Sequence, residues 1–116
     1  MSEITRHFAP GATRARAVVH DGRVYTVATS PVKSKSMEEQ TREALKQLDA
    51  RLAEAGTDKS RVLSVSVFIT DMSRKAEMNK AWDAWADPSN PPQRACMCVT
   101  LEGDDMVEMV VVAALP

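Results

Sequence analysis

The chain contains few of the residue types that mark specialised protein classes. Its 116 residues include only four glycines and six prolines, and aromatic side chains make up 4%. This composition excludes collagen-like repetition and long low-complexity linkers. Hydrophobic residues at 44% and charged residues at 27% are the proportions of a globular protein. We therefore predict a single domain over residues 1–116, with a packed core.

The chain also lacks an excess of charge of either sign. Fifteen basic and 16 acidic residues leave a formal net charge of -1. Nonspecific binding to nucleic acid or to anionic membranes depends on a strongly basic surface. Arg14 and Arg16 are too few to make one. We expect neither nucleic acid nor a membrane as a partner.

Long hydrophobic runs are missing as well. The longest apolar stretch, residues 106–116, is interrupted by Glu108 and is far shorter than the ~20 residues that span a bilayer. The first ten residues carry Glu3 and Arg6, so they lack the unbroken apolar region of a secretory signal. These features predict a cytoplasmic protein.

Strand and turn signals dominate the N-terminal quarter. Residues 4–8 are a possible edge strand, followed by a break at Pro10 and Gly11. Two β-prone segments, residues 17–20 and 23–28, flank the dipeptide Asp21-Gly22, which favours a tight hairpin turn. We predict a hairpin there.

Two helices follow from capping and periodicity. Ser36 and Glu39 match a capping box, apolar residues then recur at three-and-four spacing, and Gly56 suits a left-handed C-terminal cap, which predicts a helix over residues 37–55. A second helix is expected after Asp71 or Ser73. It carries an apolar stripe and ends at the proline-rich segment 88–92.

Three further strands are predicted at residues 61–70, 94–101 and 106–114. The polar turn at residues 102–105 suggests that the last two form a hairpin. The resulting order is β-β-α-β-α-β-β, with a possible extra strand at the N-terminus. That order predicts an α+β fold in which two helices lie on one face of a mostly antiparallel sheet.

Alternation along the expected last hairpin separates two faces. The row expected to face the helices contains Ala95, Met97, Val99, Leu101, Val107, Met109, Val111 and Ala113. The opposite row contains Arg94, Cys96, Cys98, Thr100, Met106, Glu108, Val110, Val112 and Ala114. This second row is too apolar for open water and too polar for a closed core, so we expect it to form a subunit interface.

The register of that hairpin limits which charged residues can meet. Making the apolar rows coincide favours Cys98 opposite Glu108 and leaves Arg94 ~13 Å farther along its strand. Either a bulge places Glu108 opposite Cys96, or a ligand and a water bridge the gap.

No familiar cofactor signature is present. The chain has no GxGxxG, GxxxxGK[ST], GxSxG or HExxH motif. Its only histidines, His7 and His20, are expected in surface or turn positions. Cys96 and Cys98 supply at most two soft metal ligands, and as i and i+2 residues of a strand they are badly placed to bond to each other. We expect reduced thiols, no metal and no cofactor.

Two charged residues stand on otherwise apolar strands. Arg94 begins the motif Arg94-Ala95-Cys96, and Glu108 lies at the centre of Val107-Glu108-Met109. One interpretation is structural, with Arg94 as a solvated strand start and Glu108 as an edge charge that discourages aggregation. The other is that both residues belong to a functional site.

Several motifs occur in the order typical of a known family. They are Gly22-Arg23-Val24-Tyr25, Phe68-Ile69-Thr70-Asp71-Met72, Met78-Asn79, Arg94-Ala95-Cys96 and Val107-Glu108-Met109. On these motifs the chain resembles the RidA/YjgF family over roughly residues 14 to 114. The segment 78–85 resembles a bacterial subgroup of short members.

The resemblance implies a fold, an assembly and a reaction. It implies a homotrimer with a barrel-like core, helices outside and clefts between neighbouring subunits. It also implies cofactor-independent hydrolysis of reactive 2-enamine or 2-imino acids, such as 2-aminoacrylate, to 2-keto acids and ammonia. This would make the protein a hydrolase acting on C=N bonds.

The chemistry of that reaction assigns roles to three residues. The planar guanidinium of Arg94 can hold the carboxylate of a 2-imino acid with two parallel hydrogen bonds. Glu108 can orient water and move protons as the general acid/base. Cys96 is expected to line the cleft, with its backbone amide near the carboxylate. No histidine is spaced to make its thiol a nucleophile.

The chain departs from the family pattern at two places. Members with deaminase character usually carry Ser-Gly-Gln after the second strand and a tyrosine before the first. This chain has Thr29 and Ser30 near the former, and Arg14 or Ala15 near the latter. Thr29 or Ser30 can still offer a hydroxyl, and Arg14 would add positive charge. A more anionic substrate and loss of the usual one both remain open.

Two other functions are compatible with the same sequence. A trimer could bind small carboxylates or keto acids in the cleft without turnover. An exposed hydrophobic surface could instead serve a chaperone-like role in protein interaction. Trp82 and Trp85 suggest a ligand-stacking pair, but because they share the stripe of Met78 we expect them to pack against the sheet.

Overall fold

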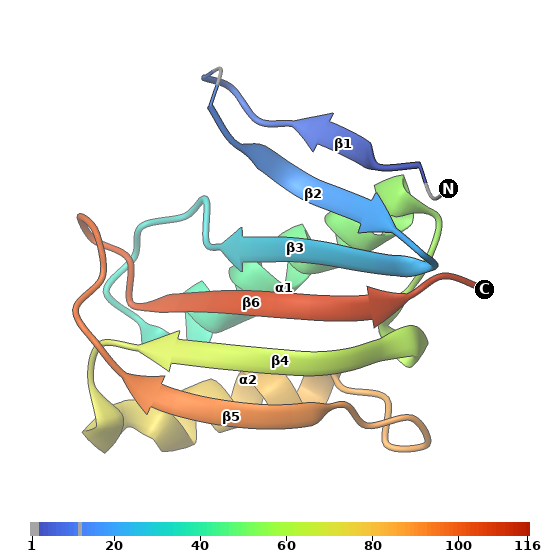
Figure 1. The fold of residues 1–116 in the computed structure, drawn as a ribbon. Coiled ribbons are helices and arrows are strands. Elements are labelled where there is room, and N and C mark those ends of the chain that lie inside the picture. The colour runs from blue at the N-terminus through green and yellow to red at the C-terminus, as the bar shows by residue number, and fades with distance from the viewer. Residues whose placement is uncertain (1–2, 12) are drawn as a thin grey trace.

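Six strands form one sheet in the spatial order β1-β2-β3-β6-β4-β5 (Figure 1). The computed structural model describes residues 3–11 and 13–116. The strands are β1 (Thr5–Phe8), β2 (Ala15–His20), β3 (Arg23–Thr29), β4 (Val62–Ile69), β5 (Gln93–Cys98) and β6 (Val107–Ala114). Neighbouring strands are antiparallel except β4 and β5, which are parallel. The extra N-terminal strand and the mostly antiparallel sheet are confirmed.

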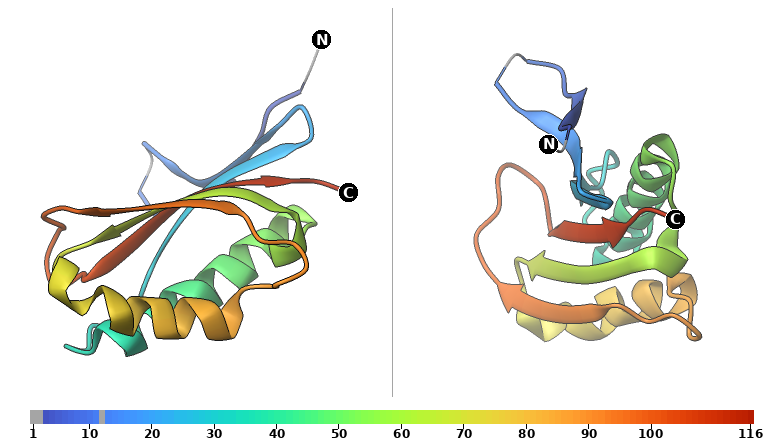
Figure 2. Two further views of the ribbon diagram at one scale, coloured as in Figure 1. Left: turned by 90° about the horizontal axis from the view of Figure 1, so that it is seen from below. Right: turned by 45° about the vertical axis from the view of Figure 1, so that its right-hand side comes forward.

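Both helices cover the same face of the sheet, as predicted (Figure 2). Helix α1 (Met37–Ala55) has the predicted bounds: the Ser36 hydroxyl accepts a hydrogen bond from the Glu39 amide, and Gly56 is left-handed with φ 90°. Helix α2 (Lys75–Trp85) begins after a 3-10 turn at Met72–Arg74, where the Asp71 side chain accepts from the Ser73 amide. No helix within residues 3–11 and 13–116 is long and apolar enough to cross a membrane.

The hairpin of β2 and β3 turns where the sequence predicts. Asp21 and Gly22 both have positive φ, 50° and 73°, which is the geometry of a type I′ turn. Pairing between the two strands extends from the turn to Ala17 and Thr26. Beyond that point β2 diverges from β3, and the β1–β2 hairpin rises away from the rest of the sheet (Figure 2).

The core lies between the sheet and the two helices. Alternate residues of β6, among them Met109 and Val111, are buried against α1 residues such as Leu45 and Leu48. The other face of the sheet carries no helix (Figure 1). Several of its large apolar side chains are exposed, for example Tyr25 at 45%.

The prediction that the last two strands form a hairpin is wrong. β4 lies between β5 and β6, pairing with β5 in parallel and with β6 in antiparallel orientation. β5 ends at Cys98, and residues 99–106 cross the end of β4 instead of making a tight turn. Glu108 is therefore flanked by Thr29 of β3 and Phe68 of β4, and not by Cys98 or Cys96.

The predicted orientation of β5 is also wrong. Arg94 and Cys96 pair with Val65 and Val67, which are buried under the helices. Neighbouring residues in register share a face of the sheet, so Arg94 and Cys96 face the helices, whereas Ala95 faces the open side. Alternation separates two rows of residues along a strand, but it does not say which row the helices cover.

Candidate functional site

Arg94 is held against an aromatic ring of helix α2. The central carbon of its guanidinium lies 5.1 Å from the centroid of the Trp82 ring, and Nη1 lies 3.7 Å from the sulfur of Met78. The cation–π contact holds the guanidinium beside the Trp82 ring. Within residues 3–11 and 13–116, Arg94 has no carboxylate partner. This half-buried cation is a candidate anion-binding group.

Glu108 is the corresponding acidic residue without a partner. It is half-buried on the open face of β6, between Thr29 and Phe68. Its carboxylate makes no hydrogen bond or ion pair with any residue in the described part of the chain. A carboxylate without a partner, beside a hydroxyl residue on an apolar face, can accept a proton from water and return it.

One copy of the chain does not bring Arg94 and Glu108 together. Arg94 faces the helices from the edge strand β5, whereas Glu108 lies on the opposite face of the sheet, with β4 between the two strands. The two groups can act on one small substrate only if they come from different copies.

The remaining predicted residues occupy different surroundings. The Cys96 side chain packs against the core, while Cys98 is exposed at the end of β5. Thr29 shares the open face with Glu108. The Ser30 hydroxyl is fully buried and occupied, since it donates to the Val32 carbonyl at 2.6 Å and accepts from the Val32 amide at 3.0 Å. Arg14 is exposed just before β2, at the end where β2 has diverged from β3.

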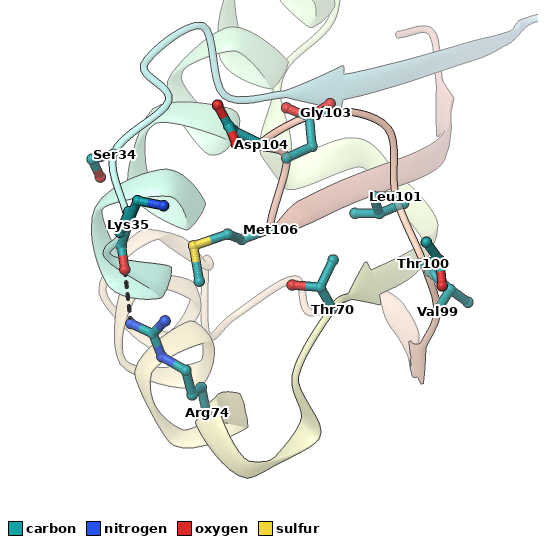
Figure 3. A pocket seen from close by; sticks show the side chains of 11 residues that line it. Ser34, Lys35, Thr70, Arg74, Val99, Thr100, Leu101, Gly103, Asp104 and Met106 are labelled. Carbon is teal, nitrogen blue, oxygen red and sulfur yellow. Dashed lines mark hydrogen bonds between the residues drawn. The ribbon is translucent and has the colours of Figure 1, made fainter.

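A hollow of about 430 Å³ lies where β4 ends and the 99–106 segment begins (Figure 3). Thr70 and Met106 line it beside Arg74, whose guanidinium donates to the Lys35 carbonyl at 3.1 Å. None of the predicted catalytic residues lines this hollow. Met106, which lines the hollow, directly precedes β6, the strand that carries Glu108.

Gln40 holds the rim of this hollow in place. Its fully buried amide nitrogen donates to the carbonyls of Ser34 and Asp104, and its amide oxygen accepts from the Met106 backbone at 2.9 Å. The side chain thus joins the start of α1 to the segment that leads to Glu108. Sequence reasoning missed this role and had no signal for it, since Gln40 is an ordinary polar position in a helical pattern.

The sequence also did not reveal that Trp82 supports Arg94. The prediction that both tryptophans pack against the sheet is confirmed for Trp82, which is 7% exposed within the core. Its second contact, with Arg94, was not foreseen. The stripe that Trp82 shares with Met78 predicts burial of both residues, but it does not predict that Arg94 contacts both.

Metal binding finds no support in the geometry. Across residues 3–11 and 13–116, no three His, Cys, Asp or Glu side chains are grouped so that they could hold an ion. The arrangement offers an anion-binding guanidinium, an unpartnered carboxylate and hydroxyl groups. These groups suit the binding of a small acid and proton transfer to or from it.

Together, the fold and the site define a small α+β protein with a guanidinium and a carboxylate on opposite faces of one sheet. The family model described as Endoribonuclease L-PSP matches residues 4–115. A RutC family protein from Haemophilus ducreyi is 36% identical over 103 residues, covering 87% of this chain and 88% of the relative. One from Haemophilus influenzae is 34% identical over 107 residues, covering 90% and 92%.

Solved structures agree with the sequence comparisons. A YjgF family member from Neisseria meningitidis has a TM-score of 0.90 at 32% identity, covering 98% of this chain and 96% of that one. An uncharacterized protein from Pseudomonas aeruginosa has a TM-score of 0.91 at 31% identity, covering 98% and 100%. The chain belongs to the RidA/YjgF family, also described under the names RutC and L-PSP.

Proposed function

We propose that the protein hydrolyses reactive 2-enamine and 2-imino acids, such as 2-aminoacrylate, to 2-keto acids and ammonia. The observation that carries this proposal is the guanidinium of Arg94, half-buried on the Trp82 ring with no carboxylate partner among the described residues. A 2-imino acid presents a carboxylate that two parallel N–H groups of an arginine can hold. Family membership supports the assignment.

Glu108 supplies the proton transfers that the reaction needs. The substrate reacts as its iminium form, C=NH2+, which an enamine reaches by taking a proton at C3. Water adds to the C=N carbon and gives one proton to the Glu108 carboxylate. Glu108 then returns this proton to the nitrogen of the tetrahedral adduct, which becomes NH3+. When the C–N bond breaks, the hydroxyl of the adduct gives its proton to Glu108 and becomes the C=O of the keto acid, and Glu108 passes that proton to the departing ammonia. The step requires no oxidant and no cofactor, and in this proposal the hydroxyl of Thr29, which lies opposite Glu108 on β3, hydrogen-bonds the water.

The site in this proposal is shared between copies of the chain in a homotrimer. Arg94 and Glu108 face opposite sides of one sheet, so one substrate can meet both groups only between subunits. The open face is suited to burial by neighbouring copies, because exposed Tyr25, Val27 and Val110 alternate with a few polar side chains. Three copies, the number that the family resemblance implies, would close these faces into a barrel-like core.

The residues near the site that differ from the family pattern affect which imino acid the site would bind. The Ser30 hydroxyl is occupied by Val32, so Thr29 is the hydroxyl residue available beside Glu108. Arg14 is exposed and free to approach a neighbouring copy. A second positive charge near the substrate would favour imino acids that carry an additional acidic group.

The experiment replaces Glu108 with glutamine. The rate of 2-keto acid formation from freshly generated 2-aminoacrylate is compared with its spontaneous decay. Glu108→Gln should lower the protein-dependent rate on the order of 100-fold or more, because the general acid/base is lost. Binding of a 2-keto acid should persist. Glu102→Gln, an exposed loop substitution in the same segment, is the matched control and should retain full activity.

Three other results would each point to a different function. Binding of 2-keto acids without any acceleration by the wild-type protein would indicate a non-catalytic carboxylate binder. Suppression of client aggregation that survives Arg94→Ala would indicate a chaperone-like role of the open face. RNA cleavage would fit the endoribonuclease description of the family model, although a net charge of -1 argues against affinity for a phosphate backbone.

A further inference from the structure

A second recess lies on the outer surface, between helices α1 and α2. Its apolar lining, called the floor below, consists of the buried Leu45 and Ala81, the half-buried Trp85 and the exposed Ala84. The recess has a volume of about 340 Å³. This size is at the lower end of the roughly 300–1,000 Å³ typical of small-molecule pockets. The helices lie on the side of the sheet opposite the open face (Figure 2). The recess therefore stays accessible when neighbouring copies cover the open face.

The indole of Trp85 is fixed in position within this recess. Its Nε1–H donates to Asp49 of α1 at 2.9 Å, and the Trp82 ring lies 5.3 Å away, centroid to centroid. Lys59 also contacts Trp85. Its ammonium lies 5.5 Å from the centroid of the Trp85 ring and donates to the Trp85 carbonyl at 2.6 Å. A ring held this way presents apolar surface to a ligand without an ordering cost.

The rim of the recess is basic. Four cationic side chains and one carboxylate, Glu38, line it; the cations are Arg42, Lys46, Lys59 and Lys80. Glu38 lies 3.7 Å from Arg42 and 3.5 Å from Lys80. Lys46 is 3.5 Å from Glu43, which does not line the recess. Such long, exposed ion pairs contribute little, so the cations can turn toward an anion in the recess at low cost.

We propose that this recess binds a small amphipathic carboxylate, with its aromatic or branched apolar body on Trp85 and its anionic end among the rim cations. An apolar floor under a basic rim excludes cationic ligands by charge, and it leaves neutral ligands without the ionic contact. The recess is too small for a folded partner. It does not include Arg94 or Glu108, so this inference is independent of the proposed reaction.

The two tryptophans of the chain allow a direct test. Titration of the 15N-labelled protein with 2-naphthoate should shift the indole N–H signal of Trp85 and the amide signals of residues near Ala84. The uncharged analogue 2-naphthalenemethanol should bind about five- to tenfold more weakly, because it lacks the charge-assisted contact. Arg94→Ala should leave the naphthoate titration unchanged, which separates this recess from the proposed active site.

A pair of matched variants locates the binding. Ala84→Glu places a negative charge in the recess and should abolish naphthoate binding. Ala76→Glu makes the same substitution at an exposed position of the same helix that does not line the recess, and it should bind like the wild type. Glutamate is a good helix former, so both variants should fold.

Each alternative outcome would overturn the inference. Equal affinity for naphthoate and its neutral analogue would show that the recess binds through apolar contacts alone and that the rim cations do not contribute. Equal binding by the Ala84→Glu and Ala76→Glu variants would place the ligand elsewhere. Loss of the Trp85 shifts in Arg94→Ala would assign the naphthoate to the proposed active site. Binding of an acidic peptide but not of naphthoate would identify a protein-docking surface instead.

Discussion

At the residue scale, the buried side-chain amide of Gln40 joins the start of helix α1 to the segment that leads to β6. Gln40 is fully buried and forms three hydrogen bonds with backbone groups of two loops. Its neighbour Thr41 is also fully buried, but it donates only to the Met37 carbonyl within its own helix. Gln40 thus holds the 104–106 segment, which precedes Glu108, together with the Lys33–Asp105 ion pair and the hydrogen bond from the Thr70 amide to the Met106 carbonyl.

Replacing Gln40 with leucine should therefore destabilise the protein. The apolar side chain would leave two carbonyls and one N–H that now bond the fully buried Gln40 amide without partners, and each group left unsatisfied away from water costs about 1–3 kcal/mol. We expect a loss of about 3 kcal/mol or more in the free energy of unfolding, measured by denaturant titration. Gln47→Leu removes only the bond that Gln47 accepts from the Thr29 amide and should cost less. Equal losses would show that Gln40 has no special role.

At the element scale, a two-point ion pair between Arg16 of β2 and Glu54, called the arginine fork below, links the N-terminal hairpin to helix α1. Arg16 of β2 donates from Nε and Nη2 to the two carboxylate oxygens of Glu54, each at 2.8 Å, and its Nη1 donates to the Phe8 carbonyl. His7 of β1 lies 3.4 Å from the same carboxylate. Backbone pairing of β2 with β3 ends at Ala17, so beyond that point the fork links the hairpin to helix α1, beside the hydrogen bonds that the Arg16 carbonyl accepts from Thr26 and Arg51.

This link should depend on pH. The hydrogen bond from Arg16, aided by the charges of Arg16, His7 and Arg51, holds the pKa of Glu54 below its ordinary value of 4.5. A lowered pKa in the folded state stabilises the protein above the ordinary value, and the effect is lost as the pH falls through the lowered one. Glu54→Gln should therefore speed amide hydrogen exchange in β1 at pH 7 but have little effect once the pH has fallen below the lowered pKa of Glu54.

A second exposed ion pair provides the control for this experiment. Glu43→Gln removes a partner of Lys46, 3.5 Å away and on the same helix. Because that pair does not contact the hairpin, exchange in β1 should stay unchanged at every pH. Faster β1 exchange in Glu43→Gln as well would mean that general loss of charge, and not the fork, controls the hairpin.

Elements defined by local signals were predictable from the sequence, whereas their pairing was not. The capping box at Ser36 and the Asp21-Gly22 turn depend on neighbouring residues, and the structure confirms both. The insertion of β4 between β5 and β6 depends on contacts between distant segments. For the same reason the face of Arg94 was misassigned. Its side chain is directed by Trp82 of another element, and periodicity carries no information on that contact.

At the scale of the whole molecule, the domain is a two-layer slab with one uncovered face. Its principal extents are 46 × 37 × 20 Å, and the thin dimension accommodates only the sheet and one layer of helices. Exposed apolar side chains on the open face, including Val27 at 42% and Val110 at 40%, favour association with further copies. Association of copies would also allow Arg94 of one chain and Glu108 of another to serve one substrate, as the proposed site requires.

That arrangement predicts that two inactive variants restore activity when they are mixed. Arg94→Ala and Glu108→Gln chains, each carrying a different tag, are unfolded together and refolded at equal concentrations. In a closed ring that takes the two residues from adjacent chains, random assembly gives roughly a quarter of the sites both native residues. The mixture should therefore recover roughly a quarter of the wild-type rate. Native mass spectrometry would verify that mixed assemblies form. If they form and no activity returns, Arg94 and Glu108 do not act across a subunit boundary, because a site built within one chain always lacks one residue.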